Sequence, residues 1–425
     1  MMTPDESLAG RAVEVLRRND SGSFVKPGPS VYPFQWNWDS ALVAIGLARV
    51  APERGRAEVR SLLRGQWADG MVPHIVFHPQ DVDYSPGPEV WGSAECPDAP
   101  GIPTSGITQP PVLATAVRAL HEADPDRRFL QEVIPAIDAW HRWLHRERSL
   151  DNSGLVAILH PWESADNAPR FDAALARIGA RDALSFARSD RRHLEAAERP
   201  TDLDYRRYMT IVEGLRRHGY RPSSLREASF AYVDLCFNAV LAVAESDLAW
   251  LFSEIGRDGE RAASAAARLR TAIGDRWDED EAAYQQADLH GDQATTETIA
   301  DVFPVYAGVP DERQARKLFN ESLWSPERFG PSVEAPWAVT TVSKSSRNFD
   351  ALCYWRGPVW INVNWFLVRG LERSGLREEA EELRRLTLRL VKSSGFAEYY
   401  HPSTGAPLGS GDFSWSAALT LDLLA

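Results

Sequence analysis

Helical periodicity runs through almost the whole chain, and it constrains the fold more than any other feature. Apolar residues recur at helical spacing, strand-like alternation is scarce, and no strand–helix–strand rhythm appears. This pattern predicts an all-α fold in which pairs of helices form a barrel. The expected helices cover residues 5–18, 39–47, 52–65, 108–122, 128–147, 202–217, 224–256, 259–275, 294–306, 311–322, 358–373, 376–393 and 414–425.

Long connections between these helices hold most of the Pro, Gly and aromatic residues. Loops of this length are uncommon unless they carry function, so we expect them to form one functional rim of the barrel. No Ser/Gly linker, low-complexity run or exact repeat divides the chain, which predicts a single domain over 1–425. The long loops are 20–37, 68–107, 150–172, 177–201, 277–293, 323–356 and 394–413.

The composition of the chain makes some classes of binding partner and some cellular locations improbable. The chain has 425 residues and a net charge of −13, so binding to nucleic acid or to an anionic membrane is not expected. The N-terminus lacks the features of a signal peptide, and no run approaches the ~18 apolar residues of a membrane span. Three distant cysteines, Cys96, Cys236 and Cys353, fit reduced thiols in a cytoplasmic protein.

Several common catalytic templates are absent. The sequence has no P-loop, no dinucleotide-binding glycine motif, no nucleophile elbow and no C-x-x-C pair, so no cofactor is expected. His141 and His145 have a spacing that can hold a metal on a helix, but H-E-x-x-H is missing. Charged neighbours favour an exposed helix face for them, and no metal site is expected. The charged segment 185–199 is expected to be a solvated lid or loop.

The stretch 160–172, HPWESADNAPRFD, combines acids, Trp162 and Asn167 between prolines that prevent a long helix. A pyranose presents C–H groups on its faces and hydroxyls around its edge, so it binds to this combination of aromatic and polar groups. The chain holds 15 Trp, many beside polar residues, which favours a sugar site over simple packing. One acid here becomes catalytic if a second acid from elsewhere joins it.

Other clusters supply aromatic rings and that second acid. YPFQWNWD at 32–39 precedes a helix, and its Asp39 is either an N-cap or a carboxylate that binds sugar hydroxyls. YWRGPVW at 354–360 holds more aromatic rings than packing requires, and FAEYYHP at 396–402 surrounds Glu398 with aromatics. Two carboxylates from distant loops are what glycoside hydrolysis needs. His74, near Tyr84, is either structural or part of an anion site, and Gln109 either caps a helix or binds.

The chain resembles the bacterial mannosylglycerate and glucosylglycerate hydrolases of glycoside hydrolase family 63 from about residue 8 to the C-terminus. YWRGPVW indicates the wider family, and the ordered set is specific to the glycosylglycerate branch. The resemblance implies an (α/α)6 barrel, or six-hairpin toroid, and hydrolysis with inversion. It rests on YPFQWNWDSA (32–41), GMVPHIVF (70–77), SGITQPP (105–111), PWESADN (161–167), RPTDLDY (199–205), YWRGPVW (354–360), FAEYY (396–400) and TGAPLGS (404–410).

By motif, the resemblance implies that Asp166 is the general acid and Glu398 the base that activates water. An inverting enzyme then needs about 6.5–9.5 Å between the two carboxyl groups. Arg199 is the cation expected for the glycerate carboxylate. The glycosyl ring would contact Tyr32, Trp36, Trp38, Asp39, Trp162, Tyr354, Trp355 and Trp360, and the glycerate would contact His74, Tyr84, Gln109, Arg199 and Tyr205.

The sequence departs from the family's usual W-E-S-G-x-D-N in one turn, which is one residue shorter here and lacks the glycine. Glu163 is therefore the alternative acid. A trehalase-like or α-glucosidase-like hydrolase, a sugar epimerase and a non-catalytic sugar-binding protein remain alternatives. Mannose and glucose differ at one hydroxyl, and the sequence leaves that choice open. A homo-oligomer is compatible with the sequence, and loops 68–90 and 177–205 are expected to close over the site.

Overall fold

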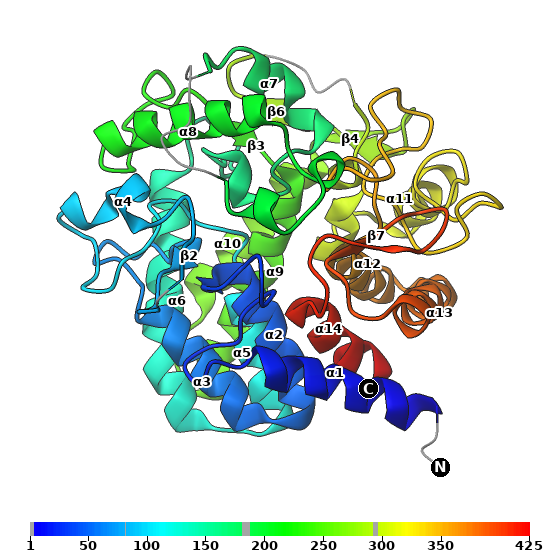
Figure 1. Ribbon diagram of the computed structural model, residues 1–425, viewed down its shortest axis with the longest axis horizontal. Helices are drawn as coiled ribbons and strands as arrows, with labels where there is room; N and C mark the ends of the chain where they lie inside the picture. The colour runs from blue at the N-terminus through cyan, green and yellow to red at the C-terminus, as the bar shows by residue number, and fades with distance from the viewer. Residues whose placement is uncertain (1–3, 81, 181–187, 292–295) are drawn as a thin grey trace.

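The computed structural model describes residues 4–80, 82–180, 188–291 and 296–425, and the chain is mostly helical with a few short strands (Figure 1). Six inner elements of this described part pack one against the next, and the ring closes because the last packs on the first. In ring order they are α2 (Asn37–Val50), α5 (Leu113–Ala123), α9 (Leu235–Glu254), the 3₁₀ helix η7 (Phe303–Ala307), α12 (Ile361–Arg373) and α14 (Ser414–Leu424).

The inner and outer helices differ in the distribution of their apolar residues. Helices α2, α9 and α14 are apolar around most of their circumference and bury most of their residues, as expected for helices inside a core. At Gly46 in α2, a Cβ atom would stand 2.3 Å from the Ala418 carbonyl oxygen, so α2 and α14 meet at van der Waals distance. Amphipathic helices cover the ring: α1 (Pro4–Asn19), α3 (Pro52–Leu63), α6 (Arg127–Glu147), α10 (Glu260–Gly274) and α13 (Arg377–Ser394).

Helix α9 is long and apolar enough, by length and composition, to cross a membrane, although polar residues such as Asn238, Glu245 and Asp247 interrupt its apolar sequence. Of its most apolar window, 72% is buried inside the protein, where α9 packs against α5, α6, α10 and η7. A core helix passes the same test of composition, and the burial accounts for its apolar character.

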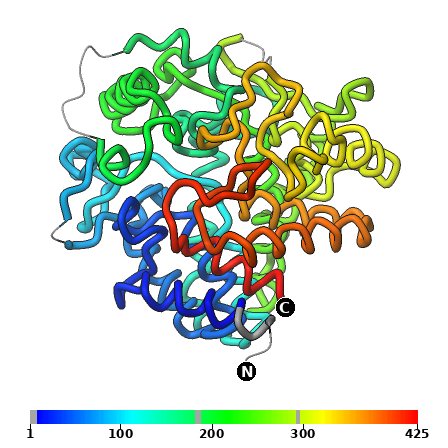
Figure 2. The backbone as a smooth tube through the Cα atoms, turned by 45° about the vertical axis from the view of Figure 1, so that its right-hand side comes forward, coloured from blue at the N-terminus to red at the C-terminus, as the bar shows by residue number. Residues whose placement is uncertain are grey.

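Short antiparallel ladders of two residues each fasten the long loops: β1 (Gln35–Trp36) with β2 (Ile75–Val76), β3 (Tyr232–Val233) with β6 (Ala287–Asp288), β4 (Trp277–Asp278) with β5 (Ala283–Tyr284), and β7 (Tyr399–Tyr400) with β8 (Pro407–Leu408). Three further helices lie between these elements: the short α4 (Pro88–Trp91) and α7 (Asp172–Ala176), and the longer α8 (Asp202–Arg217). The two ends of the chain lie on one side, where α1 packs on α14 (Figure 2).

Some helix boundaries differ from the sequence-based expectation. The helix expected over 224–256 begins at Leu235, since Asp234 caps it by accepting a hydrogen bond from the Phe237 N–H. The helix expected at 108 begins at Leu113 because two prolines precede it. The segment expected as one helix over 294–306 forms 3₁₀ turns at η6 (Ile299–Asp301) and η7, and residues 294–295 lie outside the described residues. Helix α11 (Glu312–Leu318) continues into a π-helical turn, Phe319–Leu323.

The prediction of an exposed face for His141 and His145 is wrong. His141 is fully buried, and both imidazoles face the carboxylate of Glu245 on α9, at 3.3 Å and 2.8 Å. Arg261 from α10 binds both oxygens of the same carboxylate, at 3.0 Å and 2.8 Å. These partners hold the pKa of Glu245 well below its usual range despite burial. The pair of histidines therefore belongs to an ion cluster that joins α6, α9 and α10.

Replacing Glu245 with Gln is expected to lower the free energy of unfolding by about 1–3 kcal/mol, because the two histidines and Arg261 lose a charged hydrogen-bond partner, while Arg261 keeps Asp138 at 2.9 Å. Urea denaturation of both proteins measures the difference. Because the pKa of Glu245 is lower in the native state than its unfolded value of about 4.3, the ionised carboxylate stabilises the fold above that pH. The difference in stability between the two proteins should therefore shrink as pH falls below about 4.3. Glu254→Gln at the end of the same helix is the control, expected to change stability by less than about 1 kcal/mol. Equal effects of the two substitutions would contradict the assignment.

Candidate active site

Loop 160–172 presents Asp166 to a cavity. Two 3₁₀ turns, η2 (Pro161–Glu163) and η3 (Pro169–Phe171), flank it, because a proline begins each turn. Asp166 is 6% exposed, and its Oδ1 accepts a hydrogen bond from the Asn167 N–H at 3.0 Å. Burial raises the pKa of Asp166 to about 7, against the opposing effect of the Arg199 charge. A carboxyl group that keeps its proton near neutral pH can donate it to a leaving oxygen.

Glu163, the alternative acid, is not among the residues that line this cavity. Its carboxylate pairs with the buried guanidinium of Arg148 at 2.8 Å. It also accepts hydrogen bonds from the backbone N–H groups of Thr108 at 3.1 Å and Leu159 at 2.6 Å. These contacts make Glu163 a structural residue that joins three segments, and Asp166 is the better candidate for the acid.

Asn167 fixes the acid loop to the aromatic segment 354–360. Its Oδ1 accepts a hydrogen bond from the Trp355 N–H at 3.0 Å, and its backbone oxygen accepts one from Arg356 Nη1 at 3.1 Å. Arg356 also binds both oxygens of Asp172, at 2.9 Å and 2.7 Å. The contacts of Asn167 with Trp355 and of Arg356 with Asn167 and Asp172 therefore fix the position of Asp166 relative to the ring of Trp355.

Glu398 lies at the start of β7 and is 1% exposed. The Tyr32 hydroxyl donates to its Oε1 at 2.7 Å, and the Ser410 N–H donates to its Oε2 at 2.9 Å. Gly409 has φ +68°, and a Cβ atom there would lie 2.5 Å from Glu398 Oε2, so only glycine fits beside the carboxylate. Burial raises the pKa of Glu398, and the Arg199 charge and these hydrogen bonds oppose the rise.

The segment 32–39 forms one aromatic wall of the cavity. The β1–β2 ladder pairs Trp36 with Ile75, and α2 begins directly afterwards at Asn37. Asp39 therefore lies inside the first turn of α2, and no side-chain hydrogen bond caps that helix, so the N-cap interpretation of Asp39 is wrong. Asp39 is buried and lines the cavity, where burial and the Glu398 charge raise its pKa well above the usual range.

The second wall consists of stacked rings from 354–360. Trp355 lines the cavity, and Trp360 stacks directly behind it, with ring centroids 3.7 Å apart and planes 4° from parallel. Trp360 is fully buried and is not a lining residue, so it supports the wall from behind. Its indole N–H donates to the Tyr354 carbonyl oxygen at 3.0 Å, beside the left-handed backbone of Tyr354 at φ +41°.

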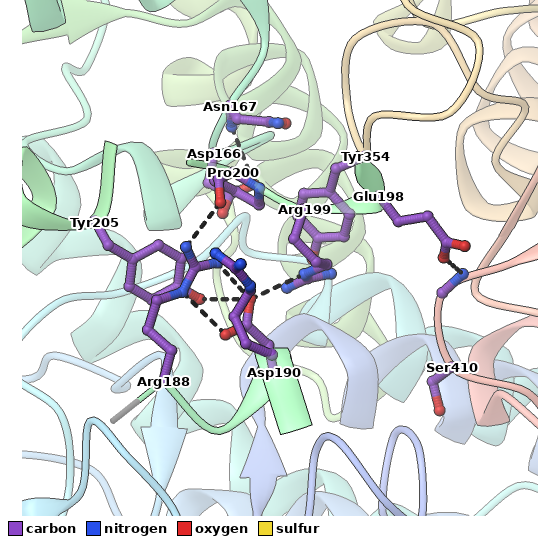
Figure 3. A network of polar contacts seen from close by, with 12 residues as sticks. Asp166, Asn167, Arg188, Asp190, Glu198, Arg199, Pro200, Tyr205, Tyr354 and Ser410 are labelled. Atoms are coloured by element: carbon purple, nitrogen blue, oxygen red, sulfur yellow. Dashed lines mark hydrogen bonds and ion pairs between the residues drawn. The ribbon is translucent and has the colours of Figure 1, made fainter. Parts of the chain in front are cut away.

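Arg199 brings a buried positive charge between the acids. It is 4% exposed, its Nε donates to Asp190 at 3.2 Å, and its Nη1 stands 3.6 Å from Glu398 Oε1. Its guanidinium lies 3.9 Å from the centre of the Tyr354 ring (Figure 3). Arg188 and Asp190 are buried too, whereas residues 191–193 and 195–197 are exposed, so the expectation of a solvated segment over 185–199 holds for its middle only; residues 185–187 lie outside the described part.

The remaining polar residues line the other end of the cavity. The Trp36 ring packs edge-on against both His74 and Tyr84, with ring centroids 6.4 Å and 5.8 Å apart, and both residues line the cavity. Burial lowers the pKa of His74 well below its usual range, so it serves as a neutral hydrogen-bonding group. Gln109 Oε1 accepts a hydrogen bond from the Trp38 N–H at 3.3 Å, which places Gln109 at the start of α2.

One cavity of about 700 Å³, including its open mouth, gathers these side chains. Trp360 is the predicted residue that stays behind the lining. Trp91, Phe413 and Trp415 also line the cavity without having been predicted individually, and Phe413 carries no polar signal in the sequence. The lining consists of Tyr32, Trp36, Trp38, Asp39, His74, Ile75, Tyr84, Pro86, Trp91, Gln109, Trp162, Ser164, Asp166, Arg199, Tyr205, Tyr354, Trp355, Glu398, Phe413 and Trp415.

A family model described as a mannosylglycerate hydrolase MGH1-like glycoside hydrolase domain matches residues 32–416. The chain belongs to this family. It is 41% identical over 419 residues to the mannosylglycerate hydrolase of Thermus thermophilus, covering 97% of this chain and 99% of that protein. It is 37% identical over 450 residues to the glucosylglycerate hydrolase of Mycolicibacterium hassiacum, covering 99% and 98%.

Solved structures agree with this family membership. The crystal structure of the Thermus thermophilus mannosylglycerate hydrolase of glycoside hydrolase family 63, in complex with Tris and D-glycerate, superposes with a TM-score of 0.90. It is 40% identical and covers 97% of this chain and 99% of its own. The neutral trehalase of Saccharomyces cerevisiae, at 17% identity and a TM-score of 0.57, shares the fold alone. The protein is a glycoside hydrolase of this family.

Proposed function

We propose that the protein hydrolyses 2-O-α-mannosyl-D-glycerate, 2-O-α-glucosyl-D-glycerate or both, releasing hexose and D-glycerate with inversion at the anomeric carbon. One observation carries the proposal: two buried carboxyl groups, Asp166 and Glu398, line one cavity with aromatic walls and a buried arginine. Relatives named mannosylglycerate hydrolase and glucosylglycerate hydrolase support both sugars as substrates. The complex of one relative with D-glycerate supports glycerate as the leaving group.

Asp166, as general acid, protonates the glycosidic oxygen while the bond to the anomeric carbon breaks. Glu398, as general base, removes a proton from the water that attacks the opposite face of the sugar. Tyr32 and Ser410 hold the Glu398 carboxylate by hydrogen bonds to different oxygens, which orients it toward that water. The geometry of inversion requires about 6.5–9.5 Å between the two carboxyl groups, enough for the water.

The binding roles carry over from the family resemblance, and the presence of these side chains in the lining of one cavity supports them. The hexose contacts the rings of Trp36, Trp38 and Trp355, whose faces match its C–H groups, and Asp39 accepts hydrogen bonds from its hydroxyls. Tyr32, Trp162 and Tyr354 complete that subsite. The glycerate carboxylate binds the Arg199 guanidinium, and its hydroxyl groups contact His74, Tyr84, Gln109 and Tyr205, which line the same cavity.

For the whole chain, we infer a single (α/α)6 barrel that acts in the cytoplasm. The closed ring of inner elements and the surrounding outer helices support the barrel. The three unpaired cysteines support a reducing compartment.

Hexose release from mannosylglycerate, glucosylglycerate, trehalose and maltose, run in parallel with EDTA, tests the proposed substrate class. We expect turnover of at least one glycerate conjugate and none of the two disaccharides. The first hexose formed is expected to be the β-anomer, as read by NMR. Turnover of trehalose or maltose alone would replace the proposal with a trehalase-like or α-glucosidase-like activity. Interconversion of free sugars, or binding without release, would point to an epimerase or to a binding protein.

The pH dependence of kcat/KM is expected to be bell-shaped. Asp166 must be protonated to act, so the rate should fall as pH rises above its pKa of about 7. Glu398 must be ionised, and its raised pKa moves the acidic limb upward from the usual range of a glutamate. Initial rates measured across the pH range at low substrate concentration check both limbs. A rate that is constant above neutral pH would contradict the role of Asp166.

A further inference from the structure

Asp190 sits at the centre of a buried polar cluster and is not itself among the residues that line the cavity (Figure 3). It begins the 3₁₀ turn η4 (Asp190–Arg192) and is 6% exposed. Arg188 binds both of its oxygens, through Nε at 3.1 Å and Nη2 at 2.7 Å. Asp190 Oδ2 also accepts hydrogen bonds from Arg199 Nε at 3.2 Å and from the Tyr205 hydroxyl at 3.3 Å. One carboxylate therefore connects three side chains, two of which line the cavity.

The contacts leave the terminal nitrogens of Arg199 directed away from the cluster. Asp190 accepts the hydrogen bond from Nε, and the Tyr354 ring covers one face of the guanidinium, whose central carbon lies 3.9 Å from the centre of the ring. Nη1 is buried, lies 3.6 Å from Glu398 Oε1, and has no hydrogen-bond partner among the described residues. A buried guanidinium nitrogen without a partner is costly unless a ligand provides one. Nη1 is thus left for a ligand on an arginine whose orientation is already set.

The charged partners of the two arginines also differ, and the difference leaves Arg199 facing the cavity. Arg188 and Arg199 carry two positive charges beside the single negative charge of Asp190. Arg188 finds a further partner in Asp202, at 2.9 Å, and its guanidinium stacks on the Tyr205 ring at 3.6 Å. Arg199 instead faces the cavity with the carboxyl groups of Glu398 and Asp166 as its other charged neighbours. Without Asp190, Arg199 would lose the one hydrogen bond that keeps it from turning fully onto Glu398.

We propose that Asp190 is a positioning residue that makes the enzyme specific for a carboxylate-bearing leaving group, by holding Arg199 and Tyr205 in place to bind that carboxylate. This inference rests on the proposed function. Asp190 touches no substrate; it acts through the Nε of Arg199 and the hydroxyl of Tyr205. Specificity follows because a bidentate arginine–carboxylate pair forms only when the guanidinium is held in one orientation. A neutral leaving group cannot form that pair, so it gains no binding energy from the fixed guanidinium.

The test compares a glycosylglycerate with the matching glycosylglycerol, in which CH₂OH replaces the carboxylate. Asp190→Asn is expected to lower kcat/KM for the glycerate conjugate by about tenfold or more, mainly through KM, and to change the glycerol conjugate by less than about threefold. In calorimetric titration, D-glycerate is expected to bind the variant about tenfold more weakly. Asp202→Asn is the matched control, because Asp202 binds Arg188 but not Arg199, and it should retain the selectivity.

A second variant makes the test independent of how well Asp190→Asn folds. Arg199→Lys keeps the charge but has no Nε for Asp190, so it should lose the same selectivity, and the double variant should lose no more than Arg199→Lys alone. Equal losses on both conjugates in Asp190→Asn, or full selectivity in Arg199→Lys, would overturn the inference and leave the proposed function intact. Failure of the unaltered protein to hydrolyse any glycosylglycerate would overturn the proposed function and the inference with it.

Discussion

Replacing Asp166 with Asn is expected to lower kcat by about a hundredfold to ten-thousandfold, the usual contribution of a positioned general acid. The amide keeps the shape of the side chain and can still accept the Asn167 N–H, so the fold should be unchanged. It has no proton to give to the glycosidic oxygen, and the decline of the rate above pH 7 should disappear with it. Steady-state hexose release measures the loss.

A substrate that needs no acid separates this role from a general structural effect. Fluoride leaves without protonation, so the glycosyl fluoride of the preferred hexose should be hydrolysed by Asp166→Asn at close to the normal rate. Asp202→Asn is the control, because Asp202 is an exposed carboxylate that binds Arg188 and is not among the cavity-lining residues. A variant that is equally slow on the fluoride and on the glycerate conjugate would show that Asp166 is not the acid.

Replacing Glu398 with Gln is expected to cost at least as much, and the loss should persist on the fluoride. An amide cannot take the proton of the attacking water, whatever the leaving group. The Tyr32 hydroxyl and the Ser410 N–H can still contact the side chain, so thermal unfolding should change little. Substrate affinity, measured by calorimetry with the glycerate conjugate, should survive. Recovery of activity on the fluoride would assign Glu398 to the acid side instead and reverse the two roles.

The sequence predicted the site well where chemistry and neighbouring residues coincide. Asp166 and Glu398 stand beside the aromatic rings that bury them, so a short motif carries both the acid and its environment. Asp190 and Ser410 escaped prediction because their importance lies in contacts with residues that belong to other motifs. Asp190 looked like any other charge in a polar loop until Arg199 and Tyr205 were seen around it.

The predictions of burial and of helix boundaries were wrong for related reasons. The charged neighbours of His141 suggested solvent, yet its partner Glu245 lies about a hundred positions later, on a different helix. The start of α9 was misjudged because apolar residues before Leu235 belong to strand β3, and the pattern of apolar residues alone does not separate a buried strand from a buried helix. Trp360 shares a motif with Trp355, but only the stacking of their rings shows which of them reaches the cavity.

The hydrogen bond between Tyr32 and Glu398 joins positions 366 residues apart, and it forms only where α14 closes the ring against α2. This gives the catalytic centre a very high contact order. Helices can form early and locally, but Glu398 acquires its partner Tyr32 only when distant parts of the chain meet, and such long-range contacts form more slowly than local ones. A nascent chain on the ribosome is therefore expected to have no catalytic activity until helix α14 has emerged. During refolding, the recovery of turnover should lag behind the recovery of helical structure.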